Sequence, residues 1–227
     1  MEALHHPNIV GILDVFMGDT SRIVLQDGGQ PLGRGIREPD FIRRIMRQLF
    51  YAVSHLHQHD IIHCNIEPSN LLVDDRNVLR LAGFEDARIE REGFREEISD
   101  AIAAEWGLHV GLLPFRAPEI LLGNTQFSFG VDLWSIGCVM WSMAVEGAVF
   151  EHQTTVTAHS GEVLEVICSK IGGPDQEDLA HLSRLPCWQD KWAQRQRFLL
   201  DDWPLPACFG DADKDLLEKL LCWSASR

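Results

Sequence analysis

His63-Cys64-Asn65-Ile66-Glu67-Pro68-Ser69-Asn70 is the segment from which the fold and the chemistry of this 227-residue chain are inferred. Upstream of it, apolar residues recur at helical spacing and predict a helix that Asp40 caps and that runs to about His59. Downstream, the apolar runs 71–73 and 78–81 flank a turn and predict a hairpin. The segment is therefore expected to join a long helix to a hairpin, and it holds two amides and one carboxylate.

The segment resembles the catalytic loop of protein kinases, His-Arg-Asp-Leu-Lys-Pro-x-Asn. In that family the Asp accepts the proton of the substrate hydroxyl and the Asn binds magnesium. The resemblance places Asn65 at the position of the base, Glu67 at that of the lysine and Cys64 at that of the arginine. Because an amide takes no proton near neutral pH, the resemblance implies a kinase frame whose chemistry has been removed.

Four further segments resemble kinase motifs, in the order and at roughly the spacing of the family. They are His6–Val15 (the end of the third helix and the next strand), Leu79–Arg88 (the Asp-Phe-Gly segment), Phe115–Gly123 (the Ala-Pro-Glu motif) and Val131–Cys138 (the helix that follows). The Arg before Ala-Pro-Glu and the wording Pro-Glu-Ile-Leu-Leu-Gly point to the branch of cyclin-dependent and mitogen-activated kinases.

The resemblance implies an α+β, mostly helical, kinase-like fold: a large C-terminal lobe with only a remnant of the small β lobe. Residues 1–27 are expected to be that remnant, with strands at 8–16 and 21–26, and residues 28–227 the large lobe. The glycine-rich loop and the strand lysine of kinases have no counterpart, and the first lysine is Lys170. Truncation, a piece of a longer protein, and a large lobe incomplete at its C-terminal end all stay open. Helices are expected at 117–122, 131–146, 161–171 and 213–222.

The resemblance also assigns the nucleotide and metal positions. Gly83 stands where the main magnesium ligand would be and has no side chain to offer, which leaves Asn70 as a lone secondary ligand. Leu72 would lie beneath an adenine ring, with the hinge near Gln26 and Gly28, and is expected to bind nucleotide weakly at most. No cofactor is therefore expected, whereas ATP and magnesium would be needed if the chain were an active kinase.

A second group of residues matches structural positions of the family. His63 and Phe84 match a stack of side chains between the lobes, with Ile12 as its third member. Asp132 matches the buried Asp that holds the catalytic-loop backbone, and Glu119 is expected to pair with Arg227. Leu112 falls where the family has a threonine. These roles concern packing and therefore support the fold rather than an activity.

Three alternative sites have competing structural explanations. Glu85 and Asp86 could turn a carboxylate toward a metal, but solvated residues at the start of a loop explain them better. Zinc could bind the histidines near His55 and His59, but no cysteine or carboxylate completes a tetrahedral set, and exposed helix histidines plus one core histidine are preferred. Ser99, the only hydroxyl residue between Gly83 and Glu119, is treated as an ordinary exposed serine.

Composition restricts the partners and the compartment. The formal net charge of −14 argues against a nucleic-acid or an anionic membrane surface, so proteins are the expected partners. Six cysteines without a Cys-x-x-Cys pair indicate reduced thiols and an intracellular protein, cytoplasmic or nuclear.

Three functions stay open. We favour a catalytically inactive, kinase-like interaction module, which would use 113–115 and the loop after Gly147 as contact surfaces. The second is an active or residually active ATP-dependent serine/threonine kinase. The third is a fragment of a decayed kinase gene. Dependence on a cyclin-like subunit cannot be deduced from these residues.

Overall fold

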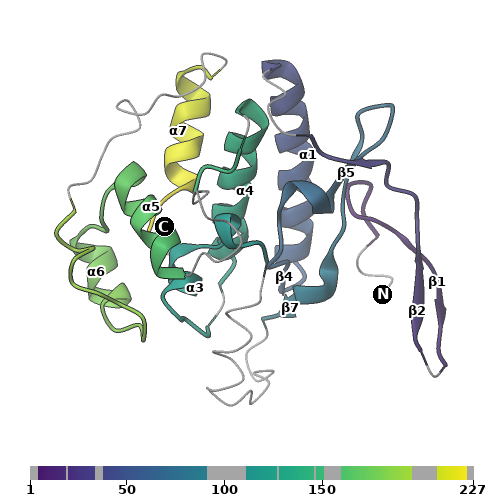
Figure 1. The fold of residues 1–227 in the computed structure, drawn as a ribbon. Coiled ribbons are helices and arrows are strands. Elements are labelled where there is room, and N and C mark those ends of the chain that lie inside the picture. Colours follow the sequence, from purple (N-terminus) through teal and green to yellow (C-terminus); the bar gives the residue numbers. More distant parts are fainter. Residues whose placement is uncertain are drawn as a thin grey trace.

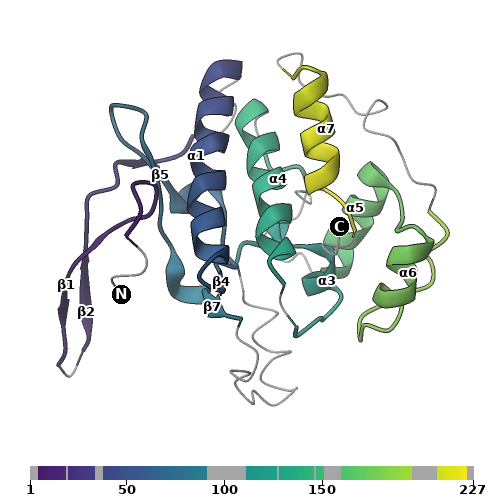
Figure 2. The same cartoon turned by 180° about the vertical axis from the view of Figure 1, so that it is seen from behind.

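The computed structural model describes residues 5–18, 20–33, 38–90, 111–126, 128–145, 147–150, 160–195 and 209–223. Helices dominate these residues, and α1, α4 and α7 run beside one another through the body of the molecule (Figures 1 and 2). Their bounds are α1 Pro39–His57, α3 Pro118–Leu121, α4 Gly130–Ala144, α5 Ser160–Ile171, α6 Gln176–Leu182 and α7 Asp211–Leu220. Every expected helix is present, and its predicted ends lie within two residues of the observed ends. Helix α6 was not predicted.

Helix α1 shows how the sequence sets this framework. The carboxylate of Glu38 accepts hydrogen bonds from the backbone N–H groups of Asp40 and Phe41, and Pro39 occupies the first turn. The cap is therefore Glu38, and the prediction that Asp40 caps the helix was wrong, because the helix begins one residue earlier. Its buried face consists of side chains at helical spacing: Ile42, Ile45, Met46, Leu49, Ala52, Val53 and Leu56.

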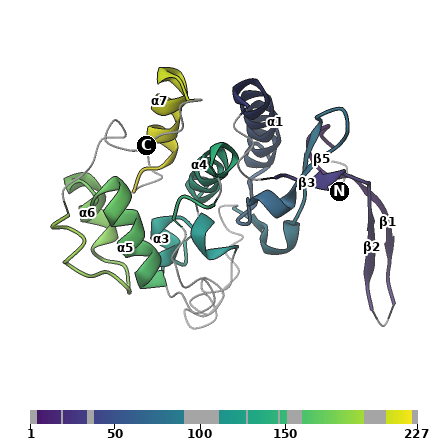
Figure 3. The same cartoon turned by 45° about the horizontal axis from the view of Figure 1, so that its top comes forward.

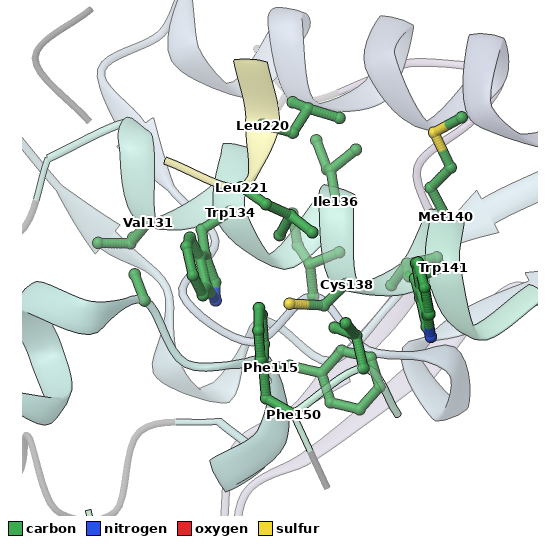
Figure 4. Close-up of a cluster of buried hydrophobic side chains, with 14 of the residues drawn as sticks. Phe115, Val131, Trp134, Ile136, Cys138, Met140, Trp141, Phe150, Leu220 and Leu221 are labelled. Carbon is green, nitrogen blue, oxygen red and sulfur yellow. The ribbon is translucent and has the colours of Figure 1, made fainter. Parts of the chain in front are cut away.

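Helix α4 lies at the centre and is buried on almost every side (Figure 4). Trp134 stacks on Phe150 with ring centroids 5.0 Å apart. At Gly137 the helix approaches α7 so closely that a Cβ atom would lie 2.8 Å from Leu221 and 2.9 Å from Leu220. A glycine at this crossing lets the two helices pack at a distance that any larger side chain would increase.

Short strands form three small sheets in the described part of the chain. Strands β1 (Ile12–Phe16) and β2 (Arg22–Leu25) make an antiparallel hairpin, with a bulge between Ile12 and Asp14. Strands β3 (Gln30–Pro31), β5 (Leu71–Val73) and β6 (Leu79–Leu81) form the second sheet, and β4 (Ile61–Ile62) pairs with β7 (Arg88–Ile89). The hairpin expected at 71–81 is present as β5 and β6. The first strand is shorter than expected, because Ile9 pairs with Leu81 in an isolated bridge instead of extending the hairpin.

The β1–β2 hairpin extends away from the helices in all three views (Figures 1 to 3). Its apolar side chains are exposed on both strands, among them Phe16 (55%) and Ile23 (59%). The segment before it is anchored differently: the Asn8 side-chain amide donates to the Leu79 carbonyl (2.8 Å) and to Gln48 Oε1 (2.9 Å). The start of the chain is thus tied to α1 and β6, whereas the hairpin stands free of the core.

None of the helices in the described ranges combines the length and the hydrophobicity that a membrane crossing requires. Ser99 and Arg227, for which the sequence analysis made predictions, lie outside these ranges.

Candidate functional site

Asp132 on α4 holds the candidate-site loop, which we define as residues 63–70. Its carboxylate, 0% exposed, accepts hydrogen bonds from the backbone N–H groups of His63 and Cys64, both at 2.9 Å. Cys64 has a φ of 64°, a left-handed conformation that costs a non-glycine residue about 1–2 kcal/mol. The two bonds to Asp132 fix this backbone from a helix 68 and 69 residues away in the sequence.

His57 is a residue of this site that sequence reasoning missed. It was expected among exposed helix histidines, but its ring is half-buried and its Nε2 lies 2.9 Å from the Asp132 carboxylate. The last turn of α1 therefore meets α4 and the loop at one point. The position of His57 at the end of a predicted helix was visible in the sequence, but no local pattern indicated its partner.

His63 is fully buried and acts as a packing and orienting residue. Its Nδ1 accepts the backbone N–H of Asn65 (3.2 Å), so the proton is on Nε2, which lies 2.9 Å from the Ala82 carbonyl oxygen. Burial lowers the pKa of this imidazole, in agreement with a neutral ring. Phe84 meets it edge-on with ring centroids 4.7 Å apart. Ile12, expected to continue this stack, is 48% exposed and does not belong to the buried cluster.

Asn65, at the position of a catalytic base, uses its backbone to brace the loop. Its carbonyl accepts the side-chain amide of Asn70 at 2.9 Å. Its own side-chain oxygen is buried and has no hydrogen-bond partner among the described residues. Gly111 lies close above, since a Cβ there would be 3.6 Å from Asn65 Oδ1 and 3.0 Å from the Cys64 carbonyl oxygen. The oxygen is thus directed into the protein rather than toward open solvent.

Gly83 and Asn70 meet where kinases would bind their metal. Gly83 has a φ of 79°, and a Cβ on it would lie 2.3 Å from the side-chain carbon of Asn70. Since real Cβ atoms do not approach other atoms within 3.0 Å, the Asn70 carboxamide occupies the place of a residue-83 side chain. Magnesium needs a carboxylate here, and this donor set does not fit it.

Of the two acids after Phe84, Asp86 has a backbone partner in the structure. Asp86, in the 3-10 turn Phe84–Asp86, accepts the backbone N–H of Gly111 at 3.2 Å. Arg116 donates to the Gly111 carbonyl from Nε (3.2 Å) and Nη2 (2.9 Å). Asp86 and Arg116 therefore clamp Gly111 from both sides. Arg116 stands out in the sequence before Ala-Pro-Glu, but its role in this clamp was not predicted.

The other side chains that were expected to contact a substrate or a partner differ in their exposure. Glu67 is half-buried and precedes the 3-10 turn Pro68–Asn70, and Leu112 is 43% exposed. Phe115 ends the 3-10 turn Leu113–Phe115 and is 2% exposed. The expectation that 113–115 forms a contact surface was therefore wrong for Phe115, because its ring fills the core beside α4 (Figure 4).

Gly28, expected at the hinge, packs against Leu72, which was expected beneath an adenine ring. A Cβ on Gly28 would be 2.5 Å from Leu72 Cδ1, and β3 pairs Pro31 with Leu72. Gln26, just before, donates its backbone N–H to the Gly11 carbonyl at 2.7 Å. Of the three residues named for nucleotide contact, Gln26 and Gly28 thus lie on one segment, and Leu72 packs against Gly28 from strand β5.

The histidines do not assemble a metal centre within the described residues, where no group of three or more His, Cys, Asp or Glu could hold an ion. His59 Nδ1 lies 2.8 Å from the His55 carbonyl oxygen, and His6 stacks on His55 at 5.0 Å. Cys64 follows His63 in the candidate-site loop. Burial raises the pKa of its thiol, so the thiol stays protonated.

Glu119, on α3, is a buried carboxyl group with a strongly shifted pKa. It is 7% exposed, and its Oε1 has no hydrogen-bond partner among the described residues. Burial, with a smaller contribution from Asp178, raises the pKa of this carboxyl to about 7. Whether Arg227 pairs with Glu119 stays a prediction.

Known proteins are similar to this chain in sequence and in fold. The family described as "Protein kinase domain" matches residues 1–227. Extracellular signal-regulated kinase 2 of Dictyostelium discoideum is 31% identical over 192 residues, which are 79% of this chain and 48% of that protein. Cell division control protein 2 homolog 3 of Trypanosoma brucei brucei is 29% identical over 233 residues, 97% of this chain and 69% of that protein. The chain thus spans about half the length of the first relative and about two thirds of the second.

Solved structures of other proteins have a similar fold. A chain of the CAK complex of Chaetomium thermophilum, bound to ATP-gamma-S, superposes with a TM-score of 0.80 at 27% identity, covering 99% of this chain and 69% of that chain. A chain of the yeast RNA Pol II CTD kinase CTDK-1 complex gives 0.79 at 21% identity, covering 98% and 72%, and shows the fold alone. With relatives among the cyclin-dependent and mitogen-activated kinases, the chain belongs to the protein kinase domain family.

Proposed function

We propose that this chain is a kinase-like protein-interaction module that transfers no phosphate. The observation that carries this proposal is the metal position, where Gly83 offers no ligand and the Asn70 amide fills the space. On this proposal the chain acts by binding, in competition with active kinases for their partners or substrates. The kinase frame, held by Asp132, supplies a stable surface for that role.

The side chains at the other two chemical positions support the same conclusion. Asn65 cannot accept a proton, and a general base contributes roughly 10²–10⁴ in rate. Glu67 would repel the phosphate that a lysine attracts. Two like charges about 4 Å apart cost on the order of 4 kcal/mol at an effective dielectric constant near 20. Loss of the metal ligand adds to both effects, because phosphoryl transfer depends almost entirely on positioning and charge.

An ATP-dependent serine/threonine kinase is the second candidate. A solved chain that matches 99% of this chain belongs to a complex bound to ATP-gamma-S. The hinge and floor around Gly28 and Leu72 keep the layout on which a weakly held nucleotide could rest. In this case the cofactors would be ATP and magnesium.

Proteins are the partners we propose, in an intracellular setting, cytoplasmic or nuclear. The matched Chaetomium chain is part of a complex, and the net charge of −14 favours a neutral or basic partner over nucleic acid.

The deciding experiment is thermal denaturation of the whole chain with and without ATP and magnesium, combined with radiolabel transfer to a basic protein. We expect one cooperative transition, no shift with ATP and magnesium, and no transfer. A magnesium-dependent shift together with transfer that Asn70→Ala abolishes would establish the active kinase instead. Glu90→Gln, at an exposed position, is the matched control. A chain without a cooperative transition would indicate a decayed fragment.

A further inference from the structure

We propose that Asn70 and Gly83 form a fitted pair that closes the metal position, so that the site is shut against a restored carboxylate rather than merely lacking one. This inference rests on the proposed function and deepens it. A site that has only lost a ligand could regain it by one substitution. A site filled by a neighbouring side chain could not.

The first support is the space itself. An ideal Cβ on Gly83 would lie 2.3 Å from Cγ, 2.4 Å from Oδ1 and 2.5 Å from Nδ2 of Asn70. All three distances are below 3.0 Å, so the whole carboxamide rather than one atom stands in the way. The φ of 79° at Gly83 adds a second requirement for glycine, because L side chains rarely adopt it.

The second support is that hydrogen bonds hold both the side chain and the backbone of Asn70 in place. Its Nδ2 donates to the Asn65 carbonyl at 2.9 Å. Its backbone N–H donates to the Glu67 carbonyl (3.0 Å), and its backbone carbonyl accepts the N–H of Ala82 (2.9 Å). The last bond ties Asn70 to the residue next to Gly83. Any side chain at position 83 must therefore break the Asn70–Asn65 bond or move the backbone.

The test is a double-mutant cycle in the full chain, with a matched glycine control. Gly123 also has a positive φ (85°), but a Cβ there would meet its nearest neighbour, Cys187, at an ordinary 3.4 Å. Gly123→Ala thus reports the cost of the backbone conformation alone. We expect Gly83→Ala to raise the unfolding equilibrium constant at least about tenfold more than Gly123→Ala does.

The cycle then isolates the contact. In an Asn70→Ala background the excess effect of Gly83→Ala should disappear, because the carboxamide is gone. Equal effects of the two glycine substitutions, or an excess that persists without Asn70, would overturn the proposal. Should Gly83→Ala fail to fold, folding of the Asn70→Ala/Gly83→Ala variant supports the fitted pair, and its failure to fold refutes it.

A magnesium-binding experiment distinguishes a failure of this inference from a failure of the proposed function. Gly83→Asp restores the carboxylate, and we expect its melting temperature to show no response to magnesium chloride with ATP. A magnesium-dependent rise would overturn the fitted pair even if the wild-type chain transfers no phosphate. Conversely, transfer by the wild-type chain would refute the proposed function while the coupling between Asn70 and Gly83 could still be measured.

Discussion

The stability of the Glu119→Gln variant, compared with that of the wild-type protein, should increase as the pH rises. The Glu119 carboxyl is buried, and burial raises its pKa to about 7 from an ordinary value of 4.5. A carboxyl that is harder to ionise in the folded state favours folding while it stays protonated. Its stabilising effect is fully present below pH 4.5 and is lost as the pH rises through 7.

The size of the effect follows from the two pKa values. One pH unit of difference corresponds to about 1.4 kcal/mol, so the interval from 4.5 to about 7 is worth about 3 kcal/mol. Glutamine has nearly the same shape and does not titrate. The difference in unfolding free energy, variant minus wild type, should therefore increase by about 3 kcal/mol between pH 4.5 and pH 8.

Urea denaturation at half-unit pH intervals measures this difference, and titrations elsewhere cancel when the two proteins are compared. Glu90→Gln, the same substitution at an exposed position, is the control. A flat difference for Glu119→Gln would refute the reasoning. A slope of opposite sign would show that a cation neutralises Glu119, as expected if Arg227 reaches it. Should the variant not fold, the carboxyl ¹³C shift of Glu119 in the wild type gives its pKa directly.

Three further substitutions test the framework by denaturant unfolding. Asp132→Ala leaves the backbone N–H groups of His63 and Cys64 buried without an acceptor and should cost about 3–5 kcal/mol; a cost below 1 kcal/mol would mean that the loop holds itself. Gly137→Ala inserts a Cβ 2.8 Å from Leu221 and should lower the unfolding free energy by about 1–3 kcal/mol. Its control, Gly161→Ala, adds a Cβ with no atom within 4 Å and should be neutral or slightly stabilising. Equal effects of the two substitutions would contradict the close crossing of α4 and α7. Glu38→Ala should cost about 1 kcal/mol through loss of the α1 cap and Asp40→Ala less than about 0.5 kcal/mol, and the reverse order would restore Asp40 as the cap.

The parts of the fold that the sequence predicted are those with a strong local period. The buried face of α1 repeats at helical spacing, and α4 is apolar almost throughout, so both were found. Helix α6 was missed because its seven residues carry few apolar side chains. Its start was visible in principle, since Asp175 and Asp178 make a reciprocal cap at the spacing of a capping box. The two-residue strands β3, β4 and β7 depend on distant partners and leave no local pattern.

The candidate site also has a part that the sequence predicted and a part that it did not. Its positions came from the resemblance to kinases, which fixes residue types and spacing. The contacts that give those positions their meaning join residues far apart in the chain. His57 meets Asp132 across 75 residues, and Asp86 meets Gly111 across 25. The fit of Asn70 against Gly83 depends on a backbone angle and a side-chain direction, and neither is encoded in residue type alone.

If the proposed function holds, the geometry also explains how a kinase frame can persist without kinase chemistry. Asp132 holds the loop through backbone N–H groups, and Asn70 braces it through the backbone carbonyl of Asn65. These bonds form whatever side chains residues 64 and 65 carry. Phosphoryl transfer, in contrast, depends on the side chains at positions 65, 67 and 83. Because the scaffold and the reaction use different atoms of the same segment, substitutions that abolish the reaction leave the bonds that hold the loop in place.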